Sequence, residues 1–305
     1  MMKTENMSED KLDLLSYLPP ATKQTSVSKE ELLNSGNAGV IIMRSGQVTN
    51  LYRNEARECA LEVCEHTNKT QKGFISSYIY EETYGQQDRI YWFIHLKSLS
   101  DYMRFHRLAN QDPAFGEIFM RNRSHFEGEY ASWINMFPEA TFNETVIVPH
   151  RWGSSGTNIP HDADSSQIIA NQQVENQRSQ VFHSANSRMV LMRSADVKVK
   201  HRSAARLFGR QYADYINSHC PSNVTCFMFE EHFGNVDRIH WHLNFEKYED
   251  YEEFIEFCAL DVGLKALMVE RIRMDGEVST AGFGHFKQSS IKDLLVCPQH
   301  PTKDF

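Results

Sequence analysis

The sequence lacks any apolar stretch near the roughly 20 residues that are needed to cross a bilayer, and charged residues interrupt the apolar runs of its first twenty positions. The continuous hydrophobic region and the small-residue cleavage site of a secretory signal are also missing. The six cysteines contain no C-x-x-C pair, which excludes a zinc ribbon and a thioredoxin-type motif. We therefore expect a cytoplasmic protein with reduced thiols and no membrane partner.

Basic runs and diagnostic catalytic motifs are scarce as well. Lysine and arginine total 32 against 40 aspartates and glutamates, which gives a formal net charge of -8. Because duplex nucleic acid is bound through many phosphate contacts, we expect no nucleic-acid partner. With 15 glycines, 9 prolines and 41% hydrophobic residues, the composition is that of a globular chain. No G-x-S-x-G elbow, H-E-x-x-H helix or dinucleotide-binding fingerprint names a reaction.

The sequence does contain an internal duplication. MRSG at 43–46 recurs as MRSA at 192–195, which is 149 residues later. The same spacing, without a gap, relates Glu81-Glu82 to Glu230-Glu231, Gly85 to Gly234, Asp88-Arg89-Ile90 to Asp237-Arg238-Ile239, Trp92 to Trp241, and Phe105 to Phe254. A fixed spacing over such a length indicates two copies of one structural unit.

Each copy shows the same order of predicted elements. A short apolar strand precedes an amphipathic helix, a hairpin of two strands rich in β-branched and aromatic residues, a second helical region and a last strand. The predicted ranges are 40–45, 54–66, 74–82, 89–96, 99–137 and 145–152 in the first copy, and 189–194, 203–217, 224–231, 238–245, 248–274 and 278–286 in the second. Matching the last strands requires a deletion of 14 residues in the second copy and pairs His150 with His285.

The order β-α-β-β-α-β is that of the ferredoxin-like unit. We predict an α+β fold made of two tandem ferredoxin-like repeats. The predicted segments are a weakly structured N-terminal segment at 1–36, the first repeat at 37–152, a polar linker at 153–186, the second repeat at 187–290 and a C-terminal tail at 291–305.

Two such repeats in one chain resemble the dimeric α+β barrel superfamily, over residues of about 40 to 290. The resemblance rests on element order and duplication. It implies two sheets that meet face to face and close a barrel, as in antibiotic-biosynthesis monooxygenases, polyketide cyclases, EthD-like proteins and the haem proteins of the chlorite-dismutase type. Since fold does not fix function, the residues must carry the functional argument.

Strand alternation separates an interior from an exterior face. On 89–96 and 238–245, one face is uniformly apolar in both copies and is expected to pack under helices. The other face is expected to line the barrel and differs between the copies. It carries Tyr91, Phe93 and His95 in the first copy and His240, His242 and Asn244 in the second.

The interior histidines have three open interpretations. His240, His242 and His95 could act as acid-base or hydrogen-bonding groups, because imidazole titrates near neutral pH. His240 and His242 could also hold a divalent metal, with His95, His150 or His285 as a third ligand. They could simply satisfy hydrogen bonds in a polar interior.

Arg44 and Arg193 occupy the same position in the two first strands. Repeated opposite charges most often form an ion-pair framework. If these arginines faced inward, they could instead bind a carboxylate, an enolate or a haem propionate.

We therefore expect a small-molecule enzyme of specialised metabolism, of the cyclase or cofactor-independent monooxygenase type, that acts on a hydrophobic aromatic or polyketide-like substrate. His240 or His242 would remove a proton from the substrate, Tyr91 and Phe93 would hold its ring, and His95, Asn244 or an inward arginine would stabilise the enolate. His150 and His285 complete the candidate substrate contacts. No cofactor is expected on this hypothesis. The alternatives are a haem- or metal-binding oxidoreductase and a non-catalytic binding or assembly module, and a homodimer is a further expectation.

Overall fold

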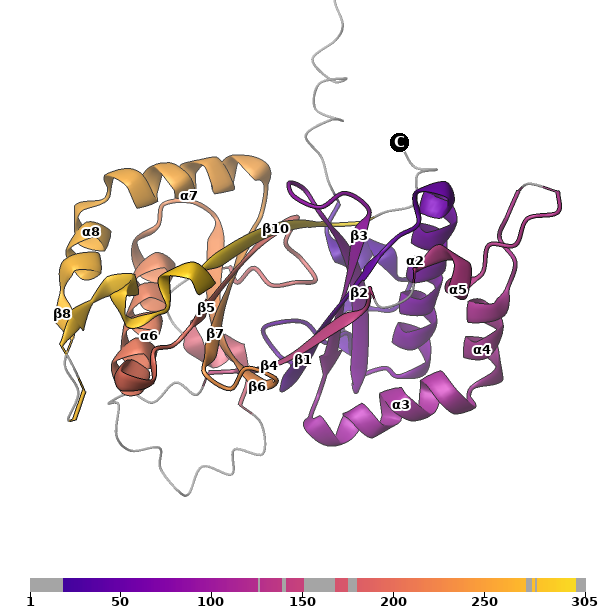
Figure 1. Ribbon diagram of the computed structural model, residues 1–305, viewed down its shortest axis with the longest axis horizontal. Helices are drawn as coiled ribbons and strands as arrows, with labels where there is room; N and C mark the ends of the chain where they lie inside the picture. The colour runs from indigo at the N-terminus through magenta and orange to yellow at the C-terminus, as the bar shows by residue number, and fades with distance from the viewer. Residues whose placement is uncertain are drawn as a thin grey trace, which may run out of the picture.

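Eight strands close into a barrel in the computed structural model (Figure 1), which describes residues 19–125, 127–138, 141–150, 168–174, 180–272, 276–277 and 279–299. The order around the barrel is β1-β3-β2-β10-β5-β7-β6-β4, and all neighbours are antiparallel. The strands are β1 Val40–Gln47, β2 Ile75–Glu82, β3 Arg89–Leu96, β4 Asn143–Pro149, β5 Met189–Asp196, β6 Val224–Phe233, β7 Arg238–Phe245 and β10 Lys292–Pro298. Because every one of these strands has two partners, the barrel presents no free edge.

Each half of the chain contributes four neighbouring strands to the barrel. The first half supplies β4-β1-β3-β2 and the second supplies β10-β5-β7-β6. Two seams, β2 with β10 and β4 with β6, join the halves. The closed α+β barrel that the sequence predicted is therefore confirmed.

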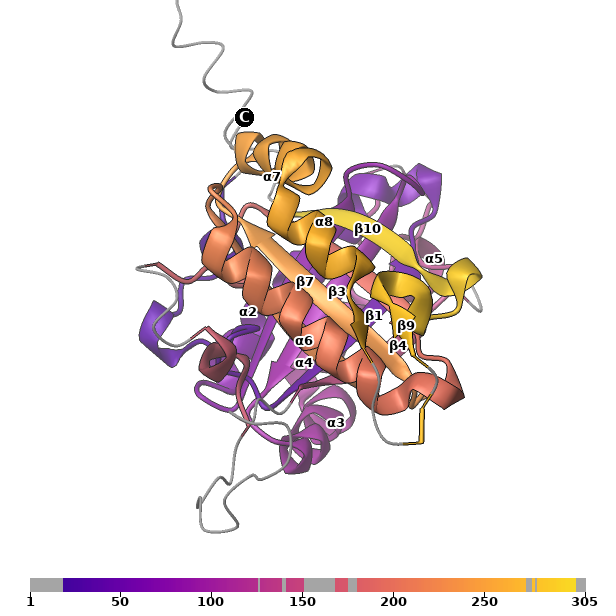
Figure 2. The ribbon, with the colours of Figure 1, turned by 90° about the vertical axis from the view of Figure 1, so that its left-hand side faces the viewer.

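Helices cover the outside of the barrel (Figures 1 and 2). The α-helices are α2 Arg53–Thr70, α3 Tyr102–Gln111, α4 Pro113–Met120, α5 Trp133–Met136, α6 Arg202–His219, α7 Tyr248–Leu260 and α8 Val262–Val269. Short 3-10 helices are η1 Ala21–Gln24, η2 Lys29–Glu31, η3 Asn50–Tyr52, η4 Leu99–Asp101, η5 Ala170–Gln173, η6 Val199–His201, η7 Gly282–His285 and η8 Gln288–Ser290. Within the described ranges, no helix is long and apolar enough to span a membrane.

Two apolar clusters hold these helices against the barrel. In the first half, Ile42 and Trp92 of the sheet pack with Ala60 of α2 and Phe105 of α3. In the second half, the corresponding cluster includes Trp241, whose indole Nε1 donates to the carbonyl oxygen of Gly209 at 2.9 Å. Burial of such large apolar surfaces is the main source of folding free energy. The outward apolar faces that the alternation predicted are thus where the helices dock.

The last strand of the second half differs from the sequence prediction. The predicted range 278–286 contains instead the short strand β9 Thr280–Ala281, which pairs with β8 Arg271–Ile272, and the helix η7. Gly282 has φ +50°, a left-handed conformation that ends an extended strand. The barrel strand β10 lies in the predicted tail, so the boundary at residue 290 is wrong. Because β4 and β10 are 149 residues apart, no deletion is needed, and His150 corresponds to Gln299.

Parts of the predicted N-terminal segment and of the predicted linker close one end of the barrel. The side chain of Gln24 accepts from the backbone N–H of Ile79 at 3.0 Å and donates to its carbonyl at 2.7 Å. Gln173 makes the same pair of bonds to Met228, at 2.8 Å each. These segments therefore have defined structure over 19–36, 168–174 and 180–186, although their polar composition led us to predict weak structure and a linker.

The centre of this closed end is a reciprocal serine contact. The backbone N–H of Ser35 donates to Ser184 Oγ, and the backbone N–H of Ser184 donates to Ser35 Oγ, both at 2.9 Å. The two residues are 149 positions apart and both are buried. Hydrogen bonds rather than periodic apolar contacts order this cap, so the apolar pattern of the sequence does not predict it.

Candidate functional site at the barrel mouth

The interior side chains form layers between the serine cap and the opposite end, which we call the barrel mouth. The mouth is the end where the hairpin turns 83–88 and 234–237 lie. His95 and Asn244 lie nearest the cap, Phe93 and His242 lie in the middle, and Tyr91 and His240 lie nearest the mouth. The middle layer is almost fully buried, whereas Tyr91 is half-buried. Of the six residues in these layers, Tyr91 at the mouth is therefore the most accessible.

His95 is inside the barrel, as predicted, but serves the cap. Its Nε2 accepts from Ser184 Oγ at 2.8 Å, and its Nδ1 lies 3.3 Å from the carbonyl oxygen of Ser76. Burial lowers the pKa of His95 to about 3, so the ring stays neutral. Both ring nitrogens are occupied, and the residue is 0% exposed. These contacts favour a structural role for His95.

His242 connects the two halves in the middle layer. Its ring stacks on Phe93 of the first half at a centroid distance of 6.0 Å and contacts Phe229 at 4.9 Å. Burial, with smaller contributions from His240 and His95, holds the pKa of His242 well below its usual value. Within the described residues, neither His242 Nε2 nor Asn244 Oδ1 has a hydrogen-bond partner. Buried polar atoms without partners are rare, and they mark places where a ligand or an ordered water can bind.

The mouth carries two aromatic groups that are each bonded to a carboxylate. His240 Nε2 lies 3.3 Å from Glu231 Oε2, and Tyr91 donates its hydroxyl to Glu82 Oε1 at 2.6 Å. Tyr91 and His240 are equivalent in the two halves, as are Glu82 and Glu231, since 149 residues separate each pair. The mouth is therefore symmetric in its carboxylates and asymmetric in the groups that they orient.

The protonation states at the mouth follow from these contacts. Burial acts to raise the pKa of Glu231, but the hydrogen bonds from His240 and from the backbone N–H of Asn235 outweigh it and lower that pKa. Burial and the neighbouring Glu82 carboxylate raise the pKa of Tyr91 far above its usual value. Glu231 is thus an anion and Tyr91 a hydroxyl donor at neutral pH.

Glycines in the hairpin turns position the two carboxylates. Gly234 has φ +108°, and the following N–H, that of Asn235, donates to Glu231 Oε1 at 2.6 Å. Gly85 has φ +132°, and the N–H of Gln86 donates to Glu82 Oε2 at 2.6 Å. Because these φ values are strained for any residue with a Cβ, the turn sequence fixes the orientation of the carboxylates.

Glu82 and Glu231 are site residues that the sequence analysis missed. The duplication alone does not separate these two glutamates from their neighbours Glu81 and Glu230. Glu81 and Glu230 pair on the exterior face with Arg57 at 2.6 Å and with Arg206 at 2.8 Å. Glu231 also lies 3.6 Å from Arg238, and no ion pair of the described residues involves Glu82. Alternation along β2 and β6 was the signal that could have separated the inward member of each pair from the outward one.

Four of the predicted substrate contacts lie outside the barrel interior. Arg44 pairs with Glu144, and Arg193 forms a two-bond contact with Asp293 at 2.6 and 2.7 Å. Their guanidinium groups lie over Phe105 and Phe283, which belong to the exterior clusters. The expectation that these arginines could face a substrate is wrong, because Ile42 and Leu191 on the same strand faces are exterior residues.

His150 and His285 also lie outside the barrel interior. His150 Nδ1 contacts Glu230 at 2.6 Å, and His285 is buried against Phe208 beneath α6. Neither can therefore complete a metal site with His240 and His242. Within the described residues, no group of three or more His, Cys, Asp or Glu side chains is arranged to hold a metal. The residues do not fit the three-histidine centre that we considered.

Comparison with known structures first identifies the class of fold. A "putative monooxygenase" from Fusobacterium nucleatum superposes with a TM-score of 0.53 at 7% identity, covering 86% of this chain and 93% of that one. A "putative monooxygenase" from Lactobacillus acidophilus (TM-score 0.48, 8% identity, 86% and 94% covered) and chlorite dismutase from Candidatus Nitrospira defluvii (0.47, 11%, 87% and 92%) are more distant. The chain therefore shares the overall fold of the Fusobacterium nucleatum structure.

The sequence then assigns the chain to a family. It belongs to a family of unknown function, DUF6039, whose model matches residues 13–304. No curated protein matches the sequence. Neither the fold nor the family identifies an activity, so the residues at the barrel mouth are the basis for a functional proposal.

Proposed function

We propose that this protein is a tandem ferredoxin-like barrel enzyme that removes a proton from a hydrophobic, enolisable aromatic molecule at the barrel mouth. His240 is the base, Glu231 orients and stabilises it, and Tyr91 donates a hydrogen bond to the developing oxyanion. The proposal places the enzyme in the cytoplasm and in specialised metabolism. Its finer reaction class is a cyclisation or a cofactor-independent oxygenation, since both begin with a carbanion or enolate.

The observation that carries the proposal is the His240–Glu231 contact beside the Tyr91–Glu82 contact. When Nε2–H of His240 donates to Glu231, Nδ1 keeps the lone pair that can accept a proton. The imidazolium that results lies next to an anion, which stabilises it. The proton thus moves from the substrate to Nδ1, and it returns to the product or to solvent after the reaction.

The surrounding side chains suit an aromatic substrate. Phe229, Tyr80 and Phe93 are buried aromatic residues of the barrel interior, and Tyr80 stacks on Phe93 at a centroid distance of 4.5 Å. Met43 and Leu294 are half-buried apolar neighbours of this layer. Apolar walls with a few oriented polar groups are typical of small-molecule sites.

His242 is the weaker candidate for the base. It is 1% exposed, and aromatic rings cover it on two sides. Its unpartnered Nε2 suits a buried hydrogen bond to the far end of a ligand. We therefore assign proton removal to His240 and ligand positioning to His242 and Asn244.

The test is hydrogen-deuterium exchange at an acidic C–H of a probe, measured by proton NMR in D2O. The probe is 1,8-dihydroxyanthrone under anaerobic conditions, which separates proton removal from any later reaction with oxygen. We expect the wild-type protein to accelerate the exchange and His240→Ala to lose about 100-fold or more of that acceleration. Glu231→Gln keeps the side-chain size and should lose a smaller factor, because it acts through His240.

His232→Ala is the matched control, since His232 is an exposed histidine on the same strand as Glu231. Its exchange rate should equal that of the wild type. Equal rates in the wild type and His240→Ala, or no exchange above the buffer rate, would contradict the proposal. Binding of the probe without exchange would favour a non-catalytic binding protein.

A further inference from the structure

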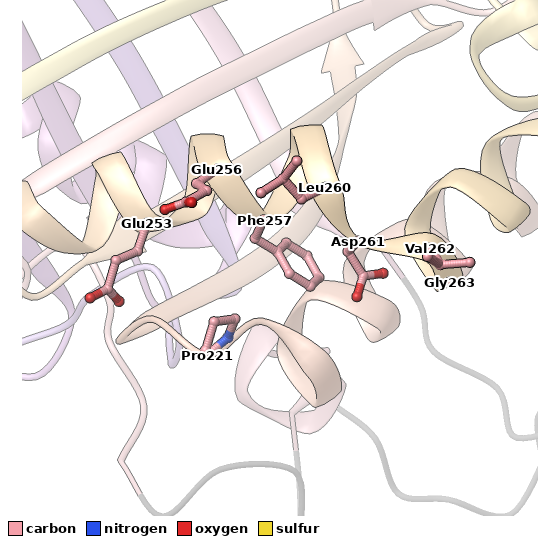
Figure 3. A pocket seen from close by; sticks show the side chains of 8 residues that line it. All are labelled: Pro221, Glu253, Glu256, Phe257, Leu260, Asp261, Val262 and Gly263. Carbon is pink, nitrogen blue, oxygen red and sulfur yellow. The ribbon is translucent and has the colours of Figure 1, made fainter.

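Two exterior grooves occupy equivalent positions in the two halves. One, of about 510 Å³, lies where α7 meets α8, and its lining includes Glu253, Glu256 and Asp261 (Figure 3). The other, of about 480 Å³, lies where α3 meets α4, and its lining includes Arg104, Arg107 and Asp112. Each of these residues in the first groove is 149 positions after its counterpart in the second.

The two grooves share the residues that stabilise the fold, which are one buried apolar side chain and one helix-capping aspartate in each. Leu108 and Phe257 are buried at equivalent positions in the exterior clusters. Asp112 caps α4 by accepting from the backbone N–H of Ala114 at 2.9 Å. Asp261 caps α8 in the same way, through the N–H of Leu264 at 2.6 Å. Capping carboxylates at helix N-termini stabilise the break between the two helices.

The rims, by contrast, carry opposite charges. Arg104 and Arg107 occupy the positions in the α3–α4 groove that Glu253 and Glu256 occupy in the α7–α8 groove, and all four side chains are exposed. The whole of α7 carries five carboxylates and no lysine or arginine, whereas α3 carries two arginines and no carboxylate. Arg104 contacts Asp101 at 3.3 Å, and no ion pair of the described residues involves the other three. The two helix pairs break at equivalent positions, Asp112 and Asp261, although their rims differ in sign, so the helix break does not require this inversion.

One molecule cannot bring its own two grooves together. In Figure 1, α7 lies along the upper edge of the second half and α3 along the lower edge of the first half, at opposite ends of the molecule. Two copies can do so, because the charged residues have the same i, i+3 spacing on both helices and can pair two by two. Leu260 and Val262 beside the acidic rim are 62% and 79% exposed, and Met103 beside the basic rim is 53% exposed. These apolar side chains would lose exposure in such a contact.

We propose that the basic groove of one copy binds the acidic groove of a second copy. Such a contact joins two different surfaces and is therefore head-to-tail. The bound pair still presents one free groove of each sign, so the contact generates a ring or an open chain of molecules rather than a closed symmetric dimer. Because exposed ion pairs are weak and screened by salt, the association is expected to be reversible and strongest at low ionic strength.

The test is sedimentation velocity over a wide range of protein concentration, at low and high salt, with three variants. Arg104→Glu/Arg107→Glu makes both grooves acidic, and Glu253→Arg/Glu256→Arg makes both basic. Each variant alone should lose self-association, with a dissociation constant at least about tenfold weaker than that of the wild type. An equimolar mixture of the two should regain association, and so should the variant with all four changes. Circular dichroism melting checks that each variant is folded.

Several outcomes would overturn the proposal. A wild-type protein that stays monomeric at low salt and high concentration would do so. Self-association that persists unchanged in either charge-reversal variant would show that copies meet elsewhere. Failure of both the mixture and the fourfold variant to regain association, with all variants folded, would show that the grooves do not recognise each other.

Discussion

His285 is fully buried, and neither of its ring nitrogens has a hydrogen-bond partner among the described residues. Burial, together with the neighbouring His201, lowers the pKa of His285 to about 4. In the unfolded chain the same ring titrates near 6.5, so the unfolded state binds the proton first. The contribution of His285 to stability is therefore complete above about pH 6.5 and is lost as the pH falls toward 4.

His285→Leu should reduce this pH dependence, because leucine fills a similar apolar space and does not titrate. We expect the free energy of unfolding to fall less between pH 7 and pH 5 in the variant than in the wild type, by about 2 kcal/mol. Urea denaturation at the two pH values measures the difference. His232→Leu, at an exposed position, is the control and should follow the wild type. An identical pH dependence in His285→Leu would show that His285 is not the source.

Gly234 orients Glu231 at the mouth. With φ +108°, an alanine is strained there, and its Cβ would lie 2.5 Å from Glu231 Oε1. We expect Gly234→Ala to destabilise the fold by about 1–2 kcal/mol and to slow the exchange reaction, since the carboxylate must move away from its present position. Gly116→Ala is the matched control.

Gly116 lies in α4, where an added Cβ meets nothing within 4 Å. Alanine there should stabilise by up to about 1 kcal/mol, because glycine costs conformational entropy in a helix. Urea denaturation measures the change in the free energy of unfolding for both variants. Equal effects of the two substitutions would argue against strain at Gly234.

At the scale of elements, the serine cap joins two loops that are far apart in sequence. Ser184→Ala removes the acceptor of the Ser35 N–H and a partner of His95, whereas Ser35→Ala removes only the acceptor of the Ser184 N–H. A buried N–H without a partner costs about 1–3 kcal/mol. We expect both variants to be destabilised, and Ser184→Ala more than Ser35→Ala.

A double-mutant cycle on Ser35 and Ser184 measures their coupling by urea denaturation. The two bonds share both residues, so the effects should not be additive. Additive losses, or no loss in either single variant, would show that the cap contributes little to stability.

The elements differ in how far the sequence could predict them. Alternation on 89–96 and 238–245 correctly separated the exterior face with Trp92 and Trp241 from the interior face with Phe93 and His242, because both faces are buried by different neighbours. The strand β10 was missed, although its Pro298 stands 149 residues after Pro149. The run 278–286 also has the composition of a strand and was therefore matched to the last strand of the first copy. The pairing of β10 with β2 and β5 identifies β10 as the barrel strand.

The candidate site was predictable in part for the same reason. His240 and Tyr91 could be found from strand parity, and the structure brings them to one end of the barrel. Their partners Glu231 and Glu82 could not be distinguished from the neighbouring ion-pair glutamates without assigning the parity of β2 and β6. The sequence also did not show which alternate positions of β1 and β5 face the interior, so it could not decide whether Arg44 and Arg193 face inward.

At the scale of the whole molecule, β10 is the strand that closes one of the two seams. A chain that ends at residue 291 would leave β2 and β5 with unpaired edges and would expose the interior side chains Tyr80 and Val190. We expect this truncated chain to lose cooperative thermal unfolding and to aggregate. A chain that ends at residue 299 keeps the strand and is the control.

Circular dichroism melting and size-exclusion chromatography compare the two chains. A truncated chain that melts as cooperatively as the control and elutes as a monomer would show that the halves fold without closure of the barrel.

The proposed function depends most directly on whether a ligand reaches His240. The decisive measurement is an NMR titration of protein labelled with ¹⁵N and ¹³C in its histidines, with 1,8-dihydroxyanthrone under anaerobic conditions and His240 assigned from the His240→Ala spectrum. We expect the ring signals of His240 to shift with the probe while those of the exposed His106 and His232 do not. Binding that leaves the His240 signals unchanged would place the ligand elsewhere and contradict an active site at the barrel mouth.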